Sequence, residues 1–238
     1  MAAGLGSRFG KHTELMPKGF VEFKGKAMVV RSIDTLIDCG ISRIIIGTGW
    51  HHEVYDALAE EYNSRYAGKV SVECVYSPRY AETNSMYTLY NCREAVGDED
   101  FLLLESDLVF ESRAISGLID CEYDSAMLIA PVTKFQDQYY VEMNGRCELV
   151  NCSTDKTEIS PSGELVGIHK LSRSFYRTCV SEYSKIAADR PKLGYEYMLL
   201  GVSRNITPMN VLKIDGLQWY EIDDDADLAF AEAHVDVD

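Results

Sequence analysis

The chain has 238 residues, of which 46% are hydrophobic, and this is enough for one sizeable α/β domain. Its net charge of −15 disfavours nucleic acid and anionic membranes as partners, because both would repel it. No stretch has the pattern of a signal peptide, and no apolar run approaches the ~20 residues of a membrane span. The seven cysteines are scattered without a Cys-x-x-Cys pair, which is typical of reduced thiols in a cytoplasmic protein.

Strands and helices are predicted to alternate in the first half of the chain. Residues 43–47, Arg-Ile-Ile-Ile-Gly, are apolar throughout, as buried parallel strands are. In 28–39 the apolar residues recur on one face of a helix. Further strands are expected at 20–23, 70–76 and 101–104, and further helices at 52–66 and 84–96. This alternation predicts βαβ units and an α/β fold with a mostly parallel, Rossmann-like sheet flanked by helices.

The second half is less regular. Two short apolar stretches flank Asn144-Gly145, a strong hairpin signal, so a small β-hairpin is expected at 139–150. The remaining strands are expected at 126–132, 165–171, 211–214 and 219–222, and the remaining helices at 172–188, 195–201 and 225–234. We expect the hairpin region to form a small lobe over the sheet.

The first eighteen residues contain the densest functional signal. Gly4 and Gly6 let the backbone approach a ligand closely, since no Cβ intervenes. Successive N–H groups in such a turn form a concavity that binds anions. Arg8 and Lys18 add positive charge around the same space. A triphosphate fits this combination better than other common ligands.

Two other glycine-rich motifs are excluded by spacing. A Walker A loop needs four residues between its first glycine and a Gly-Lys-Ser/Thr triplet, but Gly10-Lys11 is followed by His12. A dinucleotide-binding fingerprint should open a long helix, and Pro17 would break that helix. A Rossmann oxidoreductase is therefore disfavoured.

Acidic residues follow or interrupt predicted strands at two places. Asp107 comes soon after the apolar strand 101–104, at the edge of the sheet where ligands bind in α/β proteins. Glu221 and Asp223 point to the same face of a strand, because side chains alternate. Carboxylates that face a triphosphate favour Mg²⁺ between them. Asp107, Glu221 and Asp223 are therefore the candidate metal ligands.

Three stretches resemble a known family. Ala-Ala-Gly-Leu-Gly-Ser-Arg-Phe followed by Met-Pro-Lys-Gly-Phe is similar to the signature of sugar-phosphate-type nucleotidyltransferases. Asn-Ser-Met-Tyr-Thr-Leu-Tyr at 84–90 and Trp-Tyr-Glu-Ile-Asp at 219–223 resemble the cytidylyltransferase branch, which includes the phosphocholine and 2-aminoethylphosphonate enzymes. The resemblance covers essentially the whole chain. It implies an enzyme that transfers CMP from CTP to a small phosphorylated acceptor with release of pyrophosphate, assisted by Mg²⁺.

The resemblance also implies roles for individual residues. Lys18 and Arg8 would be the catalytic residues, and Asp107, Glu221 and Asp223 would hold Mg²⁺. The expected nucleotide-binding residues are Ala3, Gly4, Gly6, Ser7, Arg8, Lys18, Asn84 and Ser85. The chain would then be a single domain over 1–238, with a nucleotide-binding part at about 1–125, a substrate lobe at about 126–210 and a metal-binding segment at about 211–238.

Proteins of this kind usually carry an apolar strand just before the Ala-Ala-Gly. Here Met1 stands in its place, and we expect that the numbered chain begins late, at an internal methionine. The chain could equally be one domain of a longer fusion enzyme.

The acceptor is predicted from the residues of the second half. A quaternary ammonium calls for an aromatic cage, whereas a primary ammonium calls for hydrogen-bond acceptors. Candidates for the first are Tyr139, Tyr195 and Tyr197, and candidates for the second are Asp137 and Glu196. A phosphonate would be met by Lys134 or Arg190. The acceptor-binding set is therefore Lys134, Asp137, Tyr139, Tyr195 and Glu196.

We expect 2-aminoethylphosphonate as the acceptor, since the second half has no tryptophan between 126 and 210 for a cage. The alternatives are phosphocholine cytidylyltransferase, a sugar-1-phosphate nucleotidyltransferase, and a nucleotide-sensing domain without turnover.

Overall fold

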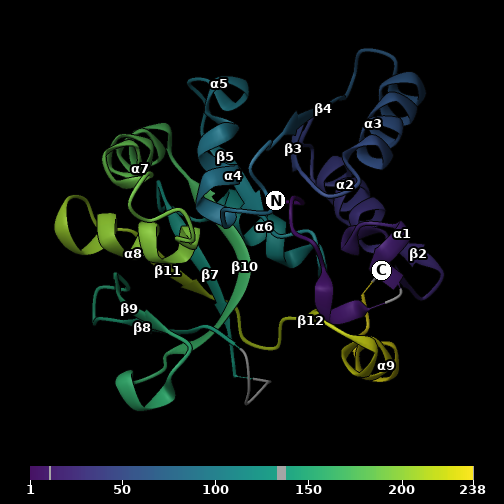
Figure 1. Cartoon of the computed structure of the whole chain (residues 1–238). Coiled ribbons are helices and arrows are strands. Elements are labelled where there is room, and N and C mark those ends of the chain that lie inside the picture. Colours follow the sequence, from purple (N-terminus) through teal and green to yellow (C-terminus); the bar gives the residue numbers. More distant parts are fainter. Residues whose placement is uncertain (11, 133–137, 238) are drawn as a thin grey trace.

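The computed structural model describes residues 1–10, 12–132 and 138–237, and it has the expected α/β fold, with helices on both faces of a mixed sheet (Figure 1). The strands are β1 Glu22–Phe23, β2 Lys26–Ala27, β3 Arg43–Thr48, β4 Ser71–Tyr76, β5 Phe101–Leu104, β6 Leu108–Phe110, β7 Ala126–Ala130, β8 Tyr140–Met143, β9 Leu149–Ser153, β10 Gly163–Leu171, β11 Asn210–Lys213 and β12 Trp219–Glu221. The α-helices are α1 His12–Leu15, α2 Met28–Asp38, α3 His52–Tyr66, α4 Ser85–Asn91, α5 Arg93–Val96, α6 Arg113–Asp120, α7 Arg173–Ile186, α8 Tyr195–Asn205 and α9 Asp225–His234. Short 3₁₀ turns lie at Ser7–Phe9, Lys18–Phe20 and Lys156–Glu158.

The strand β10 organises the largest sheet. It pairs antiparallel with β5, β7 and β8, and β11 joins the far side of β7 in parallel. The sheet is therefore mixed, and the expectation of a mostly parallel sheet is wrong for this half of the molecule. β10, at nine residues, is long enough to pair with several shorter strands along its length. Its direction relative to them was not predictable, because a strand buried on both faces is apolar throughout whichever way its neighbours run.

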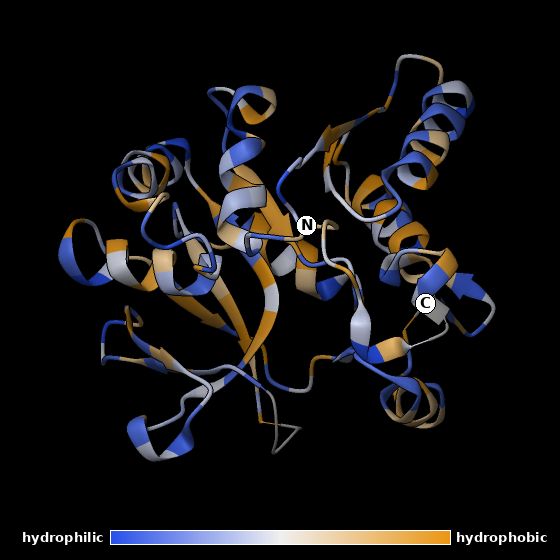
Figure 2. Ribbon diagram, viewed as in Figure 1, coloured by the Kyte–Doolittle hydropathy of each residue, from blue (hydrophilic) through white to orange (hydrophobic). Residues whose placement is uncertain are grey.

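The central strands are buried on both sides. All five residues of β7 are buried, and they alternate between two apolar clusters. One cluster contains the inner faces of α2, α3 and α6, and the other contains those of α4, α7 and α8. In Figure 2 these strands are orange, whereas the helices change from orange to blue around their circumference. The pattern of burial explains why the strands read as continuous apolar runs.

The first residues of the chain lie between two strands. The amino group of Met1 donates to the Leu104 carbonyl at 2.6 Å, and the Ala2 N–H donates to the Gly47 carbonyl at 2.8 Å. Ala2 also forms a parallel bridge with Thr48. Beyond these contacts a groove of about 370 Å³ separates β3 from β5, and its lining is mainly apolar.

Four of the described strands and α-helices were not predicted: α1, β2, β6 directly after Asp107, and α6 after it. β6 pairs antiparallel with β12, so the chain segments that carry Asp107 and Glu221 are joined side by side. A third apolar cluster, which includes Phe9, Phe23 and Ile222, packs α9 beneath this pair. None of the described helices is long and apolar enough to cross a membrane.

Candidate active site

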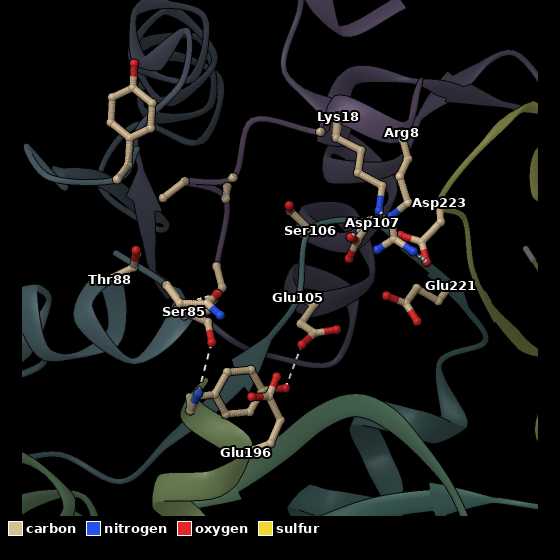
Figure 3. Close-up of a pocket in the computed structure, with 18 of the residues that line it drawn as sticks. Arg8, Lys18, Ser85, Thr88, Glu105, Ser106, Asp107, Glu196, Glu221 and Asp223 are labelled. Carbon is tan, nitrogen blue, oxygen red and sulfur yellow. Dashed lines mark hydrogen bonds and ion pairs between the residues drawn. The ribbon is translucent and has the colours of Figure 1, made fainter. Parts of the chain in front are cut away.

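A cavity of about 430 Å³ opens where the glycine-rich turn, the start of α4, the end of β5 and the end of β12 meet (Figure 3). Eleven of the residues predicted to bind nucleotide or metal or to act in catalysis line it, together with Tyr139, Tyr195 and Glu196 from the predicted acceptor set. The eleven are Ala3, Gly4, Gly6, Ser7, Arg8, Lys18, Asn84, Ser85, Asp107, Glu221 and Asp223.

The glycine-rich turn needs glycine at position 6. Gly6 has φ +61°, a left-handed conformation that side chains disfavour. A Cβ there would lie 2.9 Å from Thr13 Cγ2 and 3.1 Å from Lys18 Cβ. The Thr13 hydroxyl donates to the Gly6 carbonyl at 2.8 Å and so fixes the turn against the following segment. A Cβ built on Gly4 would have no atom within 4 Å of it, so this position opens onto the cavity.

Lys18 lies between two carboxylates that are distant in the sequence. Its Nζ is 2.6 Å from Asp107 Oδ2 and 2.5 Å from Asp223 Oδ1. Arg8 reaches Asp223 from the surface, at 2.9 Å, while 57% of its side chain is exposed. Burial opposes the charged form of Lys18, but the charges of Asp107 and Asp223 outweigh burial, and the pKa of Lys18 is raised. Lys18 is therefore a permanent cation in the cavity wall.

Three carboxylates converge beside this lysine. Ligand oxygens of Glu105, Asp107 and Glu221 all lie within 4.8 Å of one another. Oδ1 of Asp107 is buried and has no hydrogen-bond partner in the described parts of the chain. Oxygen donors of this kind suit a hard cation such as Mg²⁺. The residues thus fit a divalent ion. Glu105 belongs to this group of three carboxylates, whereas the predicted ligand Asp223 contacts Lys18 and Arg8 instead.

Glu105 is the site residue that the sequence analysis missed. Burial, reinforced by the negative charges of Asp107, Glu221 and Glu196, raises its pKa well above the usual range. The hydroxyl of Tyr195 donates to Glu105 Oε1 at 2.8 Å and lowers that pKa in part. An acidic residue two positions before Asp107 was the available signal, since i and i+2 share a face of an extended chain.

The predicted nucleoside-binding residues lie at the start of α4. Asn84 caps this helix, and its Oδ1 accepts from the Ser85 N–H at 2.8 Å. The amide nitrogen of Asn84 donates to the Lys192 carbonyl at 3.3 Å. Ser85 Oγ accepts from the Tyr195 N–H at 2.9 Å, which ties α4 to the start of α8. Both residues line the cavity while they also serve as structural caps.

Two of the predicted acceptor residues, Lys134 and Asp137, lie outside the described residues. Tyr139 packs edge-on against Tyr197, with ring centroids 5.7 Å apart. Arg190 is absent from the lining of the cavity.

Glu196 is the most unusual of the acceptor residues. It is only 6% exposed, and its Oε2 has no hydrogen-bond partner among the residues that the structure describes. Burial raises the pKa of Glu196 to about 7. A buried carboxylate oxygen without a partner is costly in the free protein, and a bound cation would relieve that cost.

A family model described as a MobA-like NTP transferase domain matches residues 1–182. The chain belongs to this family. It is a nucleotidyltransferase, and its relatives include cytidylyltransferases.

Three curated relatives illustrate the range of acceptors. CMP-5'-(3-aminopropyl)phosphonate synthase of Streptomyces rubellomurinus is 25% identical over 236 residues, which cover 95% of this chain and 37% of that protein. Choline-phosphate cytidylyltransferase of Streptococcus pneumoniae is 35% identical over 98 residues, 41% of this chain and 39% of that protein. 2-Aminoethylphosphonate cytidylyltransferase of Lancefieldella rimae is 30% identical over 115 residues, 48% and 44% respectively. The chain thus spans less than half the length of these relatives.

The fold is shared with solved nucleotidyltransferases. The structure of CTP:phosphocholine cytidylyltransferase from Streptococcus pneumoniae superposes with a TM-score of 0.78 at 24% identity, and the match covers 98% of this chain and 95% of that one. At this identity the likeness concerns the fold alone, and it confirms the predicted Rossmann-like nucleotidyltransferase architecture.

Proposed function

We propose that this nucleotidyltransferase uses CTP and joins CMP to 2-aminoethylphosphonate with release of pyrophosphate. The observation that carries the acceptor is the buried carboxylate of Glu196, whose Oε2 has no hydrogen-bond partner in the described residues and which lines the same cavity as Lys18. A primary ammonium donates three hydrogen bonds and carries one positive charge. It would therefore supply both a hydrogen-bond donor and a counter-charge to this carboxylate. Two relatives whose names contain an aminoalkylphosphonate support the proposal.

In the proposed reaction the glycine-rich turn binds the triphosphate. The open side of Gly4 admits phosphate close to the backbone, and Arg8 is exposed enough to swing from Asp223 onto the departing pyrophosphate. Lys18 remains in the cavity wall and neutralises charge on the α-phosphate. A phosphonate oxygen attacks the α-phosphorus in line, the bond to the bridging oxygen of pyrophosphate breaks, and no protein nucleophile is required.

Glu105, Asp107 and Glu221 would hold Mg²⁺, together with the predicted Asp223 once Arg8 has moved from it toward phosphate. When bound, the ion would lower the repulsion between the two anionic substrates. Asn84 and Ser85 would lie beside the cytosine and ribose, because the start of α4 forms the wall of the cavity on that side.

The acceptor would lie between the metal ligands and α8. Glu196 would pair with the ammonium, and Tyr139 would cover its carbon chain. Tyr195 would contribute its ring, since its hydroxyl already donates to Glu105. Lys134 would meet the phosphonate and Asp137 the ammonium, as the sequence analysis predicts.

A second acceptor, phosphocholine, is favoured by one observation. Tyr139, which lines the cavity, meets Tyr197 edge to face, and two such rings would be the start of a cage for a quaternary ammonium. The name of the choline-phosphate relative supports this alternative.

The test is pyrophosphate release with Mg²⁺ and CTP, with 2-aminoethylphosphonate and phosphocholine supplied separately at equal concentration. We expect release with the phosphonate and at least tenfold less with phosphocholine. Preference for phosphocholine would keep the cytidylyltransferase and overturn the role of Glu196. Greater turnover with UTP or dTTP and a sugar 1-phosphate would refute both acceptors.

A further inference from the structure

A buried chain of hydrogen bonds leads from strand β10 to the carboxylate cluster. His169 Nε2 lies 3.0 Å from the Tyr195 hydroxyl, and that hydroxyl donates to Glu105 Oε1 at 2.8 Å. His169 and Tyr195 are both fully buried. Figure 3 shows Glu105 beneath Asp107 on the side that faces Glu196. His169 itself does not line the cavity, so any effect on the site must pass through Tyr195.

Which group donates in each of these hydrogen bonds follows from counting the available hydrogens. A tyrosine has one hydroxyl hydrogen, and it goes to Glu105, so His169 must donate to the tyrosine oxygen from Nε2. Nδ1 of His169 is then a bare acceptor, and it has no partner in the described residues. A buried acceptor without a partner is tolerated better than a buried N–H without one. The tautomer assigned in this way makes His169 a donor to Tyr195 and Tyr195 a donor to Glu105 Oε1.

The backbone of β10 is shaped to hold this arrangement. Its pairing with β7 shifts register between Leu165 and His169, and Gly167 in between has φ +79°. A Cβ on Gly167 would lie 2.7 Å from Glu105 Oε2, so the carboxylate rests directly on this glycine. The Glu105 N–H also donates to the Gly167 carbonyl at 3.1 Å. A bulge beside a site commonly re-aims a side chain, and here it brings His169 behind Tyr195.

We propose that His169 is a positioning residue which, through Tyr195, orients Glu105 as a third carboxylate ligand of the divalent cation beside Asp107 and Glu221. Two donors in series hold the carboxylate of Glu105 with one oxygen satisfied, and this leaves the other oxygen for the metal. Partners of this kind typically change metal affinity by 10–100-fold when they are removed. The inference rests on the metal of the proposed reaction, but it does not depend on which acceptor is used.

The test is the affinity for Mn²⁺ in the absence of nucleotide, measured from the spin-resonance signal of the free ion. We expect Glu105→Gln, Tyr195→Phe and His169→Leu each to weaken Mn²⁺ binding by on the order of tenfold. His169→Gln should bind nearly as well as the wild type, because its amide nitrogen can donate in place of Nε2. The matched control is Tyr176→Phe, which removes another buried hydroxyl, donated to the Leu89 carbonyl at 2.6 Å, far from the cluster.

The outcomes separate the proposal from a purely structural role. Mn²⁺ affinity unchanged in Tyr195→Phe would overturn it, and this variant removes a single oxygen, so it remains informative if His169→Leu does not fold. Unchanged affinity in Glu105→Gln would remove Glu105 from the metal site, and absence of Mn²⁺ binding by the wild type would also refute the proposal. Failure of pyrophosphate release with intact Mn²⁺ binding would instead count against the proposed function alone.

Discussion

The substitution Glu196→Gln should make the free protein more stable at alkaline pH. The carboxyl of Glu196 ionises with a pKa of about 7 in the folded protein, because burial opposes its charge, and at the ordinary 4.5 when unfolded. Between these values the folded state holds a proton that the unfolded state has lost, so stability falls as pH rises. Above pH 8 the carboxyl is ionised in both states, and the difference between its two pKa values then lowers the free energy of unfolding by about 3 kcal/mol. Gln has nearly the same shape and no charge to bury.

The assay is urea unfolding at pH 5.5 and pH 8. The variant should gain about 3 kcal/mol over the wild type at pH 8 and about 1 kcal/mol at pH 5.5. The control is Glu94→Gln, whose side chain is 87% exposed, and it should change stability little at either pH. If Glu196→Gln gains nothing at pH 8, the carboxylate is not buried and unpaired in solution, and the argument for an ammonium loses its support. With 2-aminoethylphosphonate as acceptor the same variant should raise KM for the acceptor more than KM for CTP.

Three further outcomes follow from the site and the fold. Lys18→Ala should lower kcat for pyrophosphate release by on the order of 10²-fold or more, and near-normal turnover would remove Lys18 from catalysis. Chelation of divalent ions should abolish turnover and added Mg²⁺ should restore it, whereas Asp107→Asn should need more Mg²⁺ for half-maximal activity. A five-residue Val/Ile extension placed before Met1 should fill the apolar groove between β3 and β5 and raise the free energy of unfolding by on the order of 2 kcal/mol. A Gly/Ser extension of equal length is its control, and equal stability of the two would show that the groove does not accept a strand.

Three elements were predicted with their observed bounds: the helix 52–66, the strand 101–104 and the helix 225–234. The expected helix 84–96 is instead α4 and α5, divided at Cys92. β6 and α6 were missed because they have three and eight residues, too few for a period to be distinguished.

Strand direction was the part that periodicity could not supply. A buried strand is apolar on both faces whether its neighbours run parallel or antiparallel, so β10 gave no sign that it pairs antiparallel with β5 and β7. Its register shift depends on Gly167, whose positive φ is visible only in the structure. His169 therefore had no signal in the sequence that placed it behind Tyr195.

The site was predictable where charge and glycine occur together. Lys18 and Asp107 are 89 positions apart, yet both were predicted from local motifs, and they form an ion pair. Glu105 was missed because an acidic residue at a strand end is normally interpreted as exposed, whereas this one lies in the cavity wall beside other carboxylates.

The charge balance of the cavity gives a physical reason for its chemistry. Its lining contains two basic side chains and five acidic ones, namely Arg8 and Lys18 against Glu105, Asp107, Glu196, Glu221 and Asp223. Such an excess of acidic groups is not kept for stability, since a desolvated carboxylate without a matching cation raises the free energy of the folded state. The raised pKa values of Glu105 and Glu196 show that cost in the free protein. The excess is offset only when cations enter, and the two anionic substrates of a cytidylyltransferase need cations in the same place. A divalent ion at Glu105, Asp107 and Glu221 and an ammonium at Glu196 would each favour the ionised form of these carboxylates. Their binding would therefore release protons that the free cavity retains.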